Sequence, residues 1–201
     1  MAERLGERYP SVLLDHASER PQPGAVPVAY SMGARLVLHA ALDEPRRWPA
    51  MALVGVRAGV DDADARRRGD EELADWIEAH PIEEVVERWE SSPVFASQPP
   101  ELRAAQRPGR LSHEPARLAR ELRRFGQGAM PPVWDRIGEL EMPVLLVAGE
   151  LDEPYVQANR RMAALMPRAE QRIVPGCGHA AQLEAPDLVA AELRAFLDQH
   201  L

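Results

Sequence analysis

Lysine is absent from this 201-residue chain, and cysteine occurs only once, at Cys177. A single cysteine excludes an internal disulfide and a cysteine cluster that could hold zinc or an iron–sulfur centre. We therefore interpret Cys177 as a small packing residue. Because all 24 basic residues are arginine, the abundance of arginine is not by itself evidence for an anion-binding site.

Long apolar runs and an excess of positive charge are also missing. The longest apolar stretches, such as residues 143–149, fall far short of the roughly 20 residues of a membrane-spanning helix. The formal net charge of −8 argues against a general nucleic-acid binder. No apolar segment follows Met1 as it would in a secretory signal. We expect a soluble, cytoplasmic protein that binds neither membrane nor nucleic acid.

Strand-like and helix-like segments alternate in two parts of the chain. Apolar, β-branched runs predict strands over residues 11–15, 25–30, 50–56, 142–148 and 171–174. Amphipathic runs predict helices after Gly33, over 155–166 and over 186–197. The run at 50–56 lacks alternation, which is typical of a strand buried on both faces of a parallel sheet.

The segment between residues 61 and 128 has a different character, because it is rich in Arg and Glu and contains no strand-like run. Its periodicity predicts helices over 70–80, 82–90, 100–106 and 114–125. The sequence therefore predicts an α/β fold with a mostly parallel sheet. Residues 1–60 and 129–201 form the core, and residues 61–128 form a helical lid inserted between strands.

Three polar residues stand where predicted strands end: Ser31, Asp152 and His179. The carboxyl ends of parallel strands meet at one edge of a sheet, where side chains project into a crevice. The order nucleophile, acid, histidine is the order of α/β-hydrolase triads. In such a triad the imidazole takes the serine proton and the carboxylate orients the imidazole.

Each residue alone has a simpler interpretation. Ser31 could be a turn serine, since Ala29 replaces the first glycine of the usual Gly-x-Ser-x-Gly elbow. Asp152 could cap a helix, and His179 could be an ordinary loop histidine. Their joint occurrence, in order and each at a strand end, favours the triad.

Several motifs resemble the 2-succinyl-6-hydroxy-2,4-cyclohexadiene-1-carboxylate synthase family of menaquinone biosynthesis. The similar segments are residues 30–35 (Tyr-Ser-Met-Gly-Ala-Arg), the lid segment 89–97, 126–128 with Trp134, 149–152, and 178–179 with Glu184 and Pro186. The resemblance runs from about Val26 to the C-terminus. The lid segment is its most specific part, because generic esterases lack it.

The resemblance implies an α/β-hydrolase fold and a lyase reaction without cofactor or metal. The family eliminates pyruvate from a succinyl cyclohexene carboxylate, with the serine, activated by the histidine, abstracting a proton next to a carbonyl. A polycarboxylate substrate needs fixed cations, and the planar fork of arginine suits carboxylates.

By position, the resemblance assigns five substrate-binding residues. Arg35 lies one helical turn from Ser31, and the complete set is Tyr30, Arg35, Arg66 (or its neighbours Arg67 and Arg68), Trp89 and Arg110. Simpler interpretations stay open for three of them: a solvated charge run for Arg66, core packing for Trp89, and one of several loop arginines for Arg110.

The chain departs from the family pattern upstream of Ser31. An α/β-hydrolase oxyanion hole uses the backbone N–H after the nucleophile, here that of Met32, and a second N–H from an upstream loop. The His-Gly pair that usually introduces this loop is absent, since His16 is followed by Ala17 and Ser18. Loss of one oxyanion donor typically lowers the rate about 10²–10³-fold.

The short upstream region also predicts a sheet reduced on its N-terminal side, with one face partly uncovered. An uncovered apolar face favours association with a second copy of the chain. Three functional hypotheses follow: a synthase-like lyase, a generic ester or thioester hydrolase, and a catalytically weak remnant or binding module.

Overall fold

The computed structural model describes residues 2–6, 8–14 and 21–201. The chain divides into two compact units, Met1–Ala58 with Trp134–Leu201, and Gly59–Val133. The sequence places these boundaries at 60/61 and 128/129, whereas the structure places them at 58/59 and 133/134.

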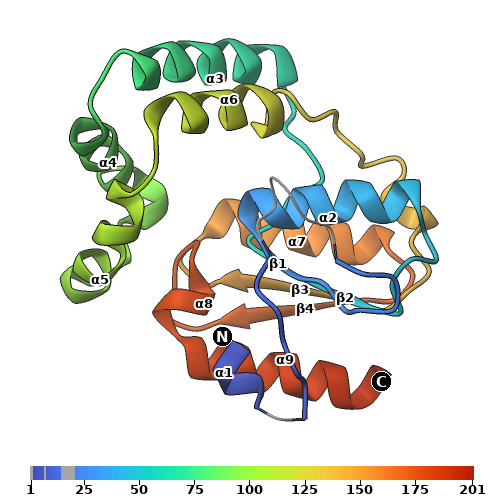
Figure 1. Ribbon diagram of the computed structural model, residues 1–201. Coiled ribbons are helices and arrows are strands. Elements are labelled where there is room, and N and C mark those ends of the chain that lie inside the picture. The colour runs from blue at the N-terminus through green and yellow to red at the C-terminus, as the bar shows by residue number, and fades with distance from the viewer. Residues whose placement is uncertain (1, 7, 15–20) are drawn as a thin grey trace. The chain divides into compact units, whose positions relative to one another are not determined.

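The first unit contains a four-stranded parallel sheet in the order β1-β2-β3-β4 (Figure 1). The strands are β1 (Val28–Tyr30), β2 (Met51–Val54), β3 (Val144–Gly149) and β4 (Ala169–Val174). One row across the sheet pairs Val28 with Ala52, Ala52 with Leu145, and Leu145 with Glu170. Every residue of the two central strands is buried, as the unbroken apolar runs predict.

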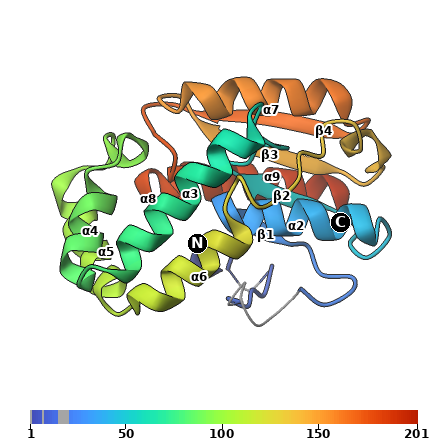
Figure 2. The same ribbon diagram turned by 90° about the horizontal axis from the view of Figure 1, so that it is seen from above.

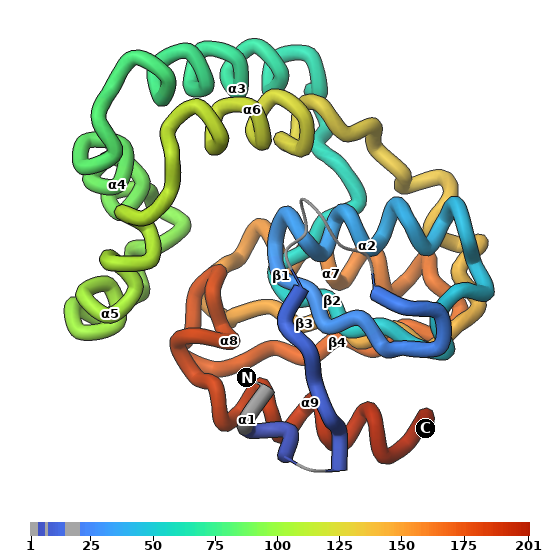
Figure 3. The backbone as a smooth tube through the Cα atoms, in the orientation of Figure 1, coloured from blue at the N-terminus to red at the C-terminus, as the bar shows by residue number. Residues whose placement is uncertain are grey.

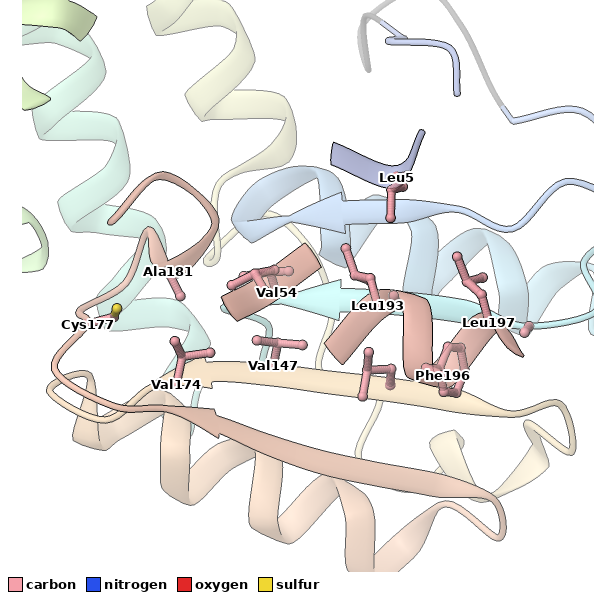
Figure 4. Packing of buried hydrophobic residues seen from close by; sticks show 13 residues of the cluster. Leu5, Val54, Val147, Val174, Cys177, Ala181, Leu193, Phe196 and Leu197 are labelled. Atoms are coloured by element: carbon pink, nitrogen blue, oxygen red, sulfur yellow. The ribbon is translucent and has the colours of Figure 1, made fainter. Parts of the chain in front are cut away.

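Helices cover both faces of this sheet. Helices α2 (Ser31–Asp43) and α7 (Glu153–Leu165) lie on one face, and α9 (Pro186–His200) lies on the other (Figures 1 and 2). Because side chains alternate along a strand, Leu145 and Val147 point toward α9. There they pack with Leu193 and Phe196 in a buried apolar cluster (Figure 4).

The N-terminal helix α1 (Ala2–Leu5) packs against α9. Leu5 is 7% exposed and joins the α9-side cluster, while the Arg4 side chain pairs with Asp187 at 2.7 Å. The Tyr9 hydroxyl also bonds Asp198. Part of the sheet face that we expect to be uncovered is therefore filled by α1.

The predicted first strand is wrong. Residues 11–14 form no strand, and the Val12 and Leu13 side chains are 83% and 95% exposed; Asp15 lies outside the described residues. With no strand there, no crossover is needed between this segment and β1. The apolar run alone does not create a strand, because a strand needs a paired neighbour and a face to bury.

The second unit is built from helices α3 (Ala63–Glu78), α4 (Ile82–Glu90), α5 (Pro100–Leu111) and α6 (Pro115–Phe125), with a 3₁₀ turn η1 (Pro93–Phe95). Helices α3 and α6 lie side by side (Figure 3) around Ala74, Ile77 and Ala119. The guanidinium of Arg123 on α6 bonds three α3 carboxylates, those of Glu71, Asp75 and Glu78. All its described elements are helical, as predicted, and α5 extends past residue 106, so that Arg110 is a helical rather than a loop residue.

Candidate active site

Ser31 occupies a sharp turn between β1 and α2. Its φ of 49° is the only positive φ of a non-glycine residue in the described part of the chain. Such a conformation costs roughly 1–3 kcal/mol and persists only where the surroundings enforce it. A strained serine between a strand and a helix is the geometry that presents Oγ at the top of a sheet.

His179 joins Ser31 to Asp152. Its Nε2 lies 2.9 Å from Ser31 Oγ, and its Nδ1 lies 2.7 Å from Asp152 Oδ2. An ionised carboxylate only accepts hydrogen bonds, so Nδ1–H donates to Asp152 and Nε2 accepts from the Ser31 hydroxyl. His179 is 5% exposed, which keeps this chain of hydrogen bonds largely away from water.

The simpler interpretation of Asp152 does not fit its contacts. Asp152 precedes α7 at the N-cap position, but its side chain makes no capping hydrogen bond. The carboxylate is directed to His179 instead. The structure therefore brings together the three residues that the sequence singles out, from the ends of β1 and β3 and from the loop after β4.

Close backbone packing fixes the His179 loop against the end of β3. A Cβ at Gly149 would lie 2.1 Å from the Gly178 carbonyl oxygen, so only glycine fits there. Leu151 N–H donates to the Cys177 carbonyl at 2.8 Å, and Gly178 N–H donates to Glu184 Oε2 at 2.8 Å. Glu184 lies in the short helix α8 (Ala181–Glu184). These hydrogen bonds fix the position of the His179 imidazole relative to the Asp152 carboxylate.

Cys177 belongs to the apolar core rather than to the reactive groups. It is 4% exposed and packs in the buried cluster between the sheet and α9 (Figure 4). Burial, with a smaller contribution from Glu184 and Glu150, raises the pKa of its thiol. A thiol with a raised pKa is a poor nucleophile, which agrees with its interpretation as a packing residue.

Gly55 is a site residue that the sequence interpretation missed. It follows β2 with a φ of 59°, and a Cβ there would lie 2.9 Å from His179 Cε1. Glycine is therefore needed both for the turn and for the approach of the imidazole. An isolated glycine within the apolar run 50–56 is the signal that could have indicated it.

Two tyrosines flank the imidazole. The Tyr155 ring centroid lies 4.4 Å from that of His179, and the Tyr30 centroid lies 5.3 Å away. Tyr30 is among the predicted site residues, whereas Tyr155, in the first turn of α7, is not. Arg57, just beyond β2, places its Cζ 5.3 Å from the Tyr155 ring centroid.

The two predicted residues on α2 differ in what the structure shows. Met32 is the second residue of α2, and the first N–H groups of a helix have no intrahelical acceptor, so its N–H suits an oxyanion. Arg35 is 9% exposed and lies one turn beyond Ser31. The upstream segment considered for the second oxyanion donor lies outside the described residues; it contains His16, Ala17 and Ser18.

Arg66, Trp89 and Arg110 belong to the second unit, where their recorded contacts also lie. Arg66 Nε donates to the buried Asp70 at 2.7 Å, and Arg110 Nη1 donates to Glu90 at 3.1 Å. Trp89 is 50% exposed, so its interpretation as a core residue is wrong. Of the neighbours of Arg66, Arg67 donates to the Gly128 carbonyl and Arg68 is exposed.

Among the described residues, no group of three His, Cys, Asp or Glu side chains is placed to hold a metal ion. In the same part of the chain, no helix has the length and apolarity needed to cross a membrane.

Residues 4–192 match the family model described as "Alpha/beta hydrolase family". A Bacillus subtilis (strain 168) protein, named as a candidate 2-succinyl-6-hydroxy-2,4-cyclohexadiene-1-carboxylate synthase, is 35% identical over 176 residues. That match covers 85% of this chain and 64% of the relative. The synthase of Serratia proteamaculans (strain 568) is 30% identical, with 85% and 66% covered. The chain thus spans slightly under two thirds of the length of these relatives.

Among solved structures, MenH from S. aureus superposes with a TM-score of 0.83 at 32% identity, covering 86% of this chain and 67% of that one. A thermophilic esterase from Thermogutta terrifontis gives a TM-score of 0.76 at 21% identity, covering 89% and 66%. The second similarity shows a shared fold only. Both agree with a parallel sheet flanked by helices.

Proposed function

The chain belongs to the alpha/beta hydrolase family, and from its similarity to synthases within this fold we propose that it acts as a 2-succinyl-6-hydroxy-2,4-cyclohexadiene-1-carboxylate synthase-like lyase. It would eliminate pyruvate from a succinyl cyclohexene carboxylate in menaquinone biosynthesis. The observation that carries the proposal is the hydrogen-bonded series Ser31, His179 and Asp152 in a chain 35% identical to a candidate synthase.

In the proposed reaction, Ser31 acts as a base rather than as an attacking nucleophile. His179 Nε2 takes the hydroxyl proton while Ser31 Oγ removes a proton next to a carbonyl of the substrate. The electron pair of that C–H bond forms a new C=C bond, and the C–O bond to the departing pyruvate breaks. The imidazolium, stabilised by Asp152, returns its proton to the leaving group. Negative charge on the carbonyl oxygen is stabilised by Met32 N–H.

Substrate binding in this proposal uses Tyr30 and Arg35 from the first unit. Arg35 is buried one turn from Ser31, where its guanidinium can face a substrate carboxylate. Arg66, Trp89 and Arg110 stay proposed substrate-binding residues on the basis of the sequence resemblance alone.

The test is pyruvate release from the succinyl cyclohexene substrate, coupled to lactate dehydrogenase. We expect turnover by the wild type and a loss of at least about 10³-fold in Ser31→Ala. Asp152→Asn should lose on the order of 10³–10⁴-fold, because an amide does not hold the imidazole in the right tautomer. A wild type that releases no pyruvate, or a Ser31→Ala variant that releases it normally, would overturn the lyase assignment.

A carboxylic ester or thioester hydrolase is the second candidate. The ion pairs of Arg66 with Asp70 and of Arg110 with Glu90 favour it, because these arginines already have anionic partners. Hydrolysis of p-nitrophenyl acetate without pyruvate release would support it. A folded wild type that a fluorophosphonate fails to label at Ser31 would instead indicate a binding module.

A further inference from the structure

Arg57 lies two residues beyond Gly55, at the carboxyl end of β2. This edge of the sheet also carries Ser31 and Asp152, and ligands of open parallel sheets bind along it. Neither the motifs around Ser31 nor those of the second unit include Arg57. Its position follows from the turn at Gly55, whose φ of 59° redirects the chain as it leaves the strand.

Tyr155 connects Arg57 to the imidazole. The Arg57 Cζ is 5.3 Å from the Tyr155 ring centroid, and the same ring lies 4.4 Å from His179. A guanidinium over an aromatic ring is held by its flat face, so its N–H edge stays available for a planar anion. The Tyr155 ring thus contacts both the Arg57 cation and the His179 imidazole without neutralising the cation.

The charge of Arg57 has no anionic partner in the described part of the chain. Its Nε is buried and makes no hydrogen bond with any described residue. Arg66, Arg110 and Arg123 differ from it, since each of them pairs with at least one carboxylate. Because the Arg57 residue as a whole is only partly buried, a ligand carboxylate could pair with this unpartnered charge.

We propose that Arg57 forms a carboxylate-binding subsite next to His179 and selects acidic substrates. The subsite takes one carboxylate of the ligand in the paired geometry of a guanidinium fork. As a subsite for a polycarboxylate it rests on the proposed function, but carboxylate binding can be measured without turnover. Arg57 touches the substrate in this role and takes no part in proton transfer.

The primary experiment is calorimetric titration of the full chain with succinate, used as a small dicarboxylate probe. We compare the wild type with Arg57→Gln and with Arg161→Gln. Arg161 is a matched control because its guanidinium also lies over an aromatic ring, 4.0 Å from that of Trp134. We expect Arg57→Gln to weaken succinate binding about tenfold or more, the range of a charge-assisted hydrogen bond, and Arg161→Gln to leave it unchanged.

Two results would overturn the subsite: no succinate binding by the wild type, or equal binding by the wild type and Arg57→Gln. If Arg57→Gln does not fold, Arg57→Lys serves in its place, because it keeps the charge and loses the fork. It should bind succinate more weakly than the wild type, and unchanged binding would contradict the proposal.

A kinetic comparison separates this proposal from the lyase assignment. With a p-nitrophenyl ester of succinic acid and with p-nitrophenyl acetate, Arg57→Gln should raise KM for the acidic ester only. Equal effects on the two esters would indicate a purely structural role. If the wild type releases no pyruvate and Arg57→Gln loses succinate binding, the lyase assignment is rejected and the carboxylate-binding subsite is supported.

Discussion

At the scale of single residues, Gly55 shows how strongly the position of His179 depends on its neighbours. A side chain at this position would need an unfavourable φ of 59° and would meet the imidazole at 2.9 Å. We expect Gly55→Ala to lower the free energy of unfolding by about 1–3 kcal/mol. It should also slow fluorophosphonate labelling of Ser31 by about tenfold or more, since a shift of the imidazole weakens its bond to Oγ.

Gly69→Ala is the control for this substitution. Gly69 lies within α3, and an added Cβ would meet no described atom within 4 Å apart from its chain neighbours and the backbone of the helix itself. Alanine there should raise the unfolding free energy by about 0.5–1 kcal/mol and leave labelling unchanged. Urea unfolding and the rate of fluorophosphonate labelling are measured for both variants. A wild-type labelling rate in Gly55→Ala would show that a Cβ at position 55 does not displace the His179 imidazole.

Residues of the site could be predicted where local sequence carries the signal. Ser31, Asp152 and His179 follow or border apolar strand segments, and their order along the chain matches a known arrangement. Tyr155 and Arg57 carry no such signal, and the only local signal for Gly55 is an isolated glycine within the apolar run 50–56. Their roles depend on distances between β2, α7 and the His179 loop, which periodicity does not encode.

At the scale of elements, the buried strands and the long helices could be predicted from periodicity. The helix expected over 82–90 has these bounds in the structure, and β2 and β3 lie within their predicted ranges or one residue beyond. The ends of the helices could not be predicted from periodicity. Helix α3 begins at Ala63 because the Asp62 side chain accepts the Ala65 N–H, and α5 continues through Pro108 despite the lost backbone donor.

The contact between β4 and α9 predicts a pH dependence of stability. The hydrogen bond from His200, and then that from Arg172, lowers the pKa of Glu170 against the opposing effect of burial. A carboxyl whose pKa is lowered on folding stabilises the protein above its ordinary value near 4.5. This stabilisation is lost as the pH falls through the folded-state pKa.

Glu170→Gln should therefore lower the unfolding free energy by about 0.5–1 kcal/mol at pH 7. The difference from the wild type should shrink steadily as the pH falls below 4.5, where the wild-type carboxyl also becomes neutral. Urea unfolding between pH 3 and pH 7 measures it. The control is Glu141→Gln, because Glu141 is exposed. A difference in unfolding free energy between Glu170→Gln and the wild type that stays constant with pH would contradict the linkage.

At the scale of the whole molecule, the parallel sheet has an open edge at β1. This strand pairs only with β2 among the described residues, and Val28 on it is 42% exposed. Residues 11–14 also expose Val12 and Leu13, which the sequence analysis assigned to a strand. An unpaired edge strand and exposed apolar side chains both favour pairing with another chain.

We therefore expect the chain to self-associate, with a sedimentation coefficient that rises with protein concentration. The double variant Val12→Ser, Leu13→Ser should weaken this association about tenfold or more, because each buried apolar side chain contributes roughly 1 kcal/mol or more. The control is Leu188→Ser with Leu201→Ser, which removes two other exposed leucines, 49% and 65% exposed, from α9 and the residue after it. Association that survives the first pair and is lost with the second would place the contact on α9, and a wild type that stays monomeric at all concentrations would refute self-association.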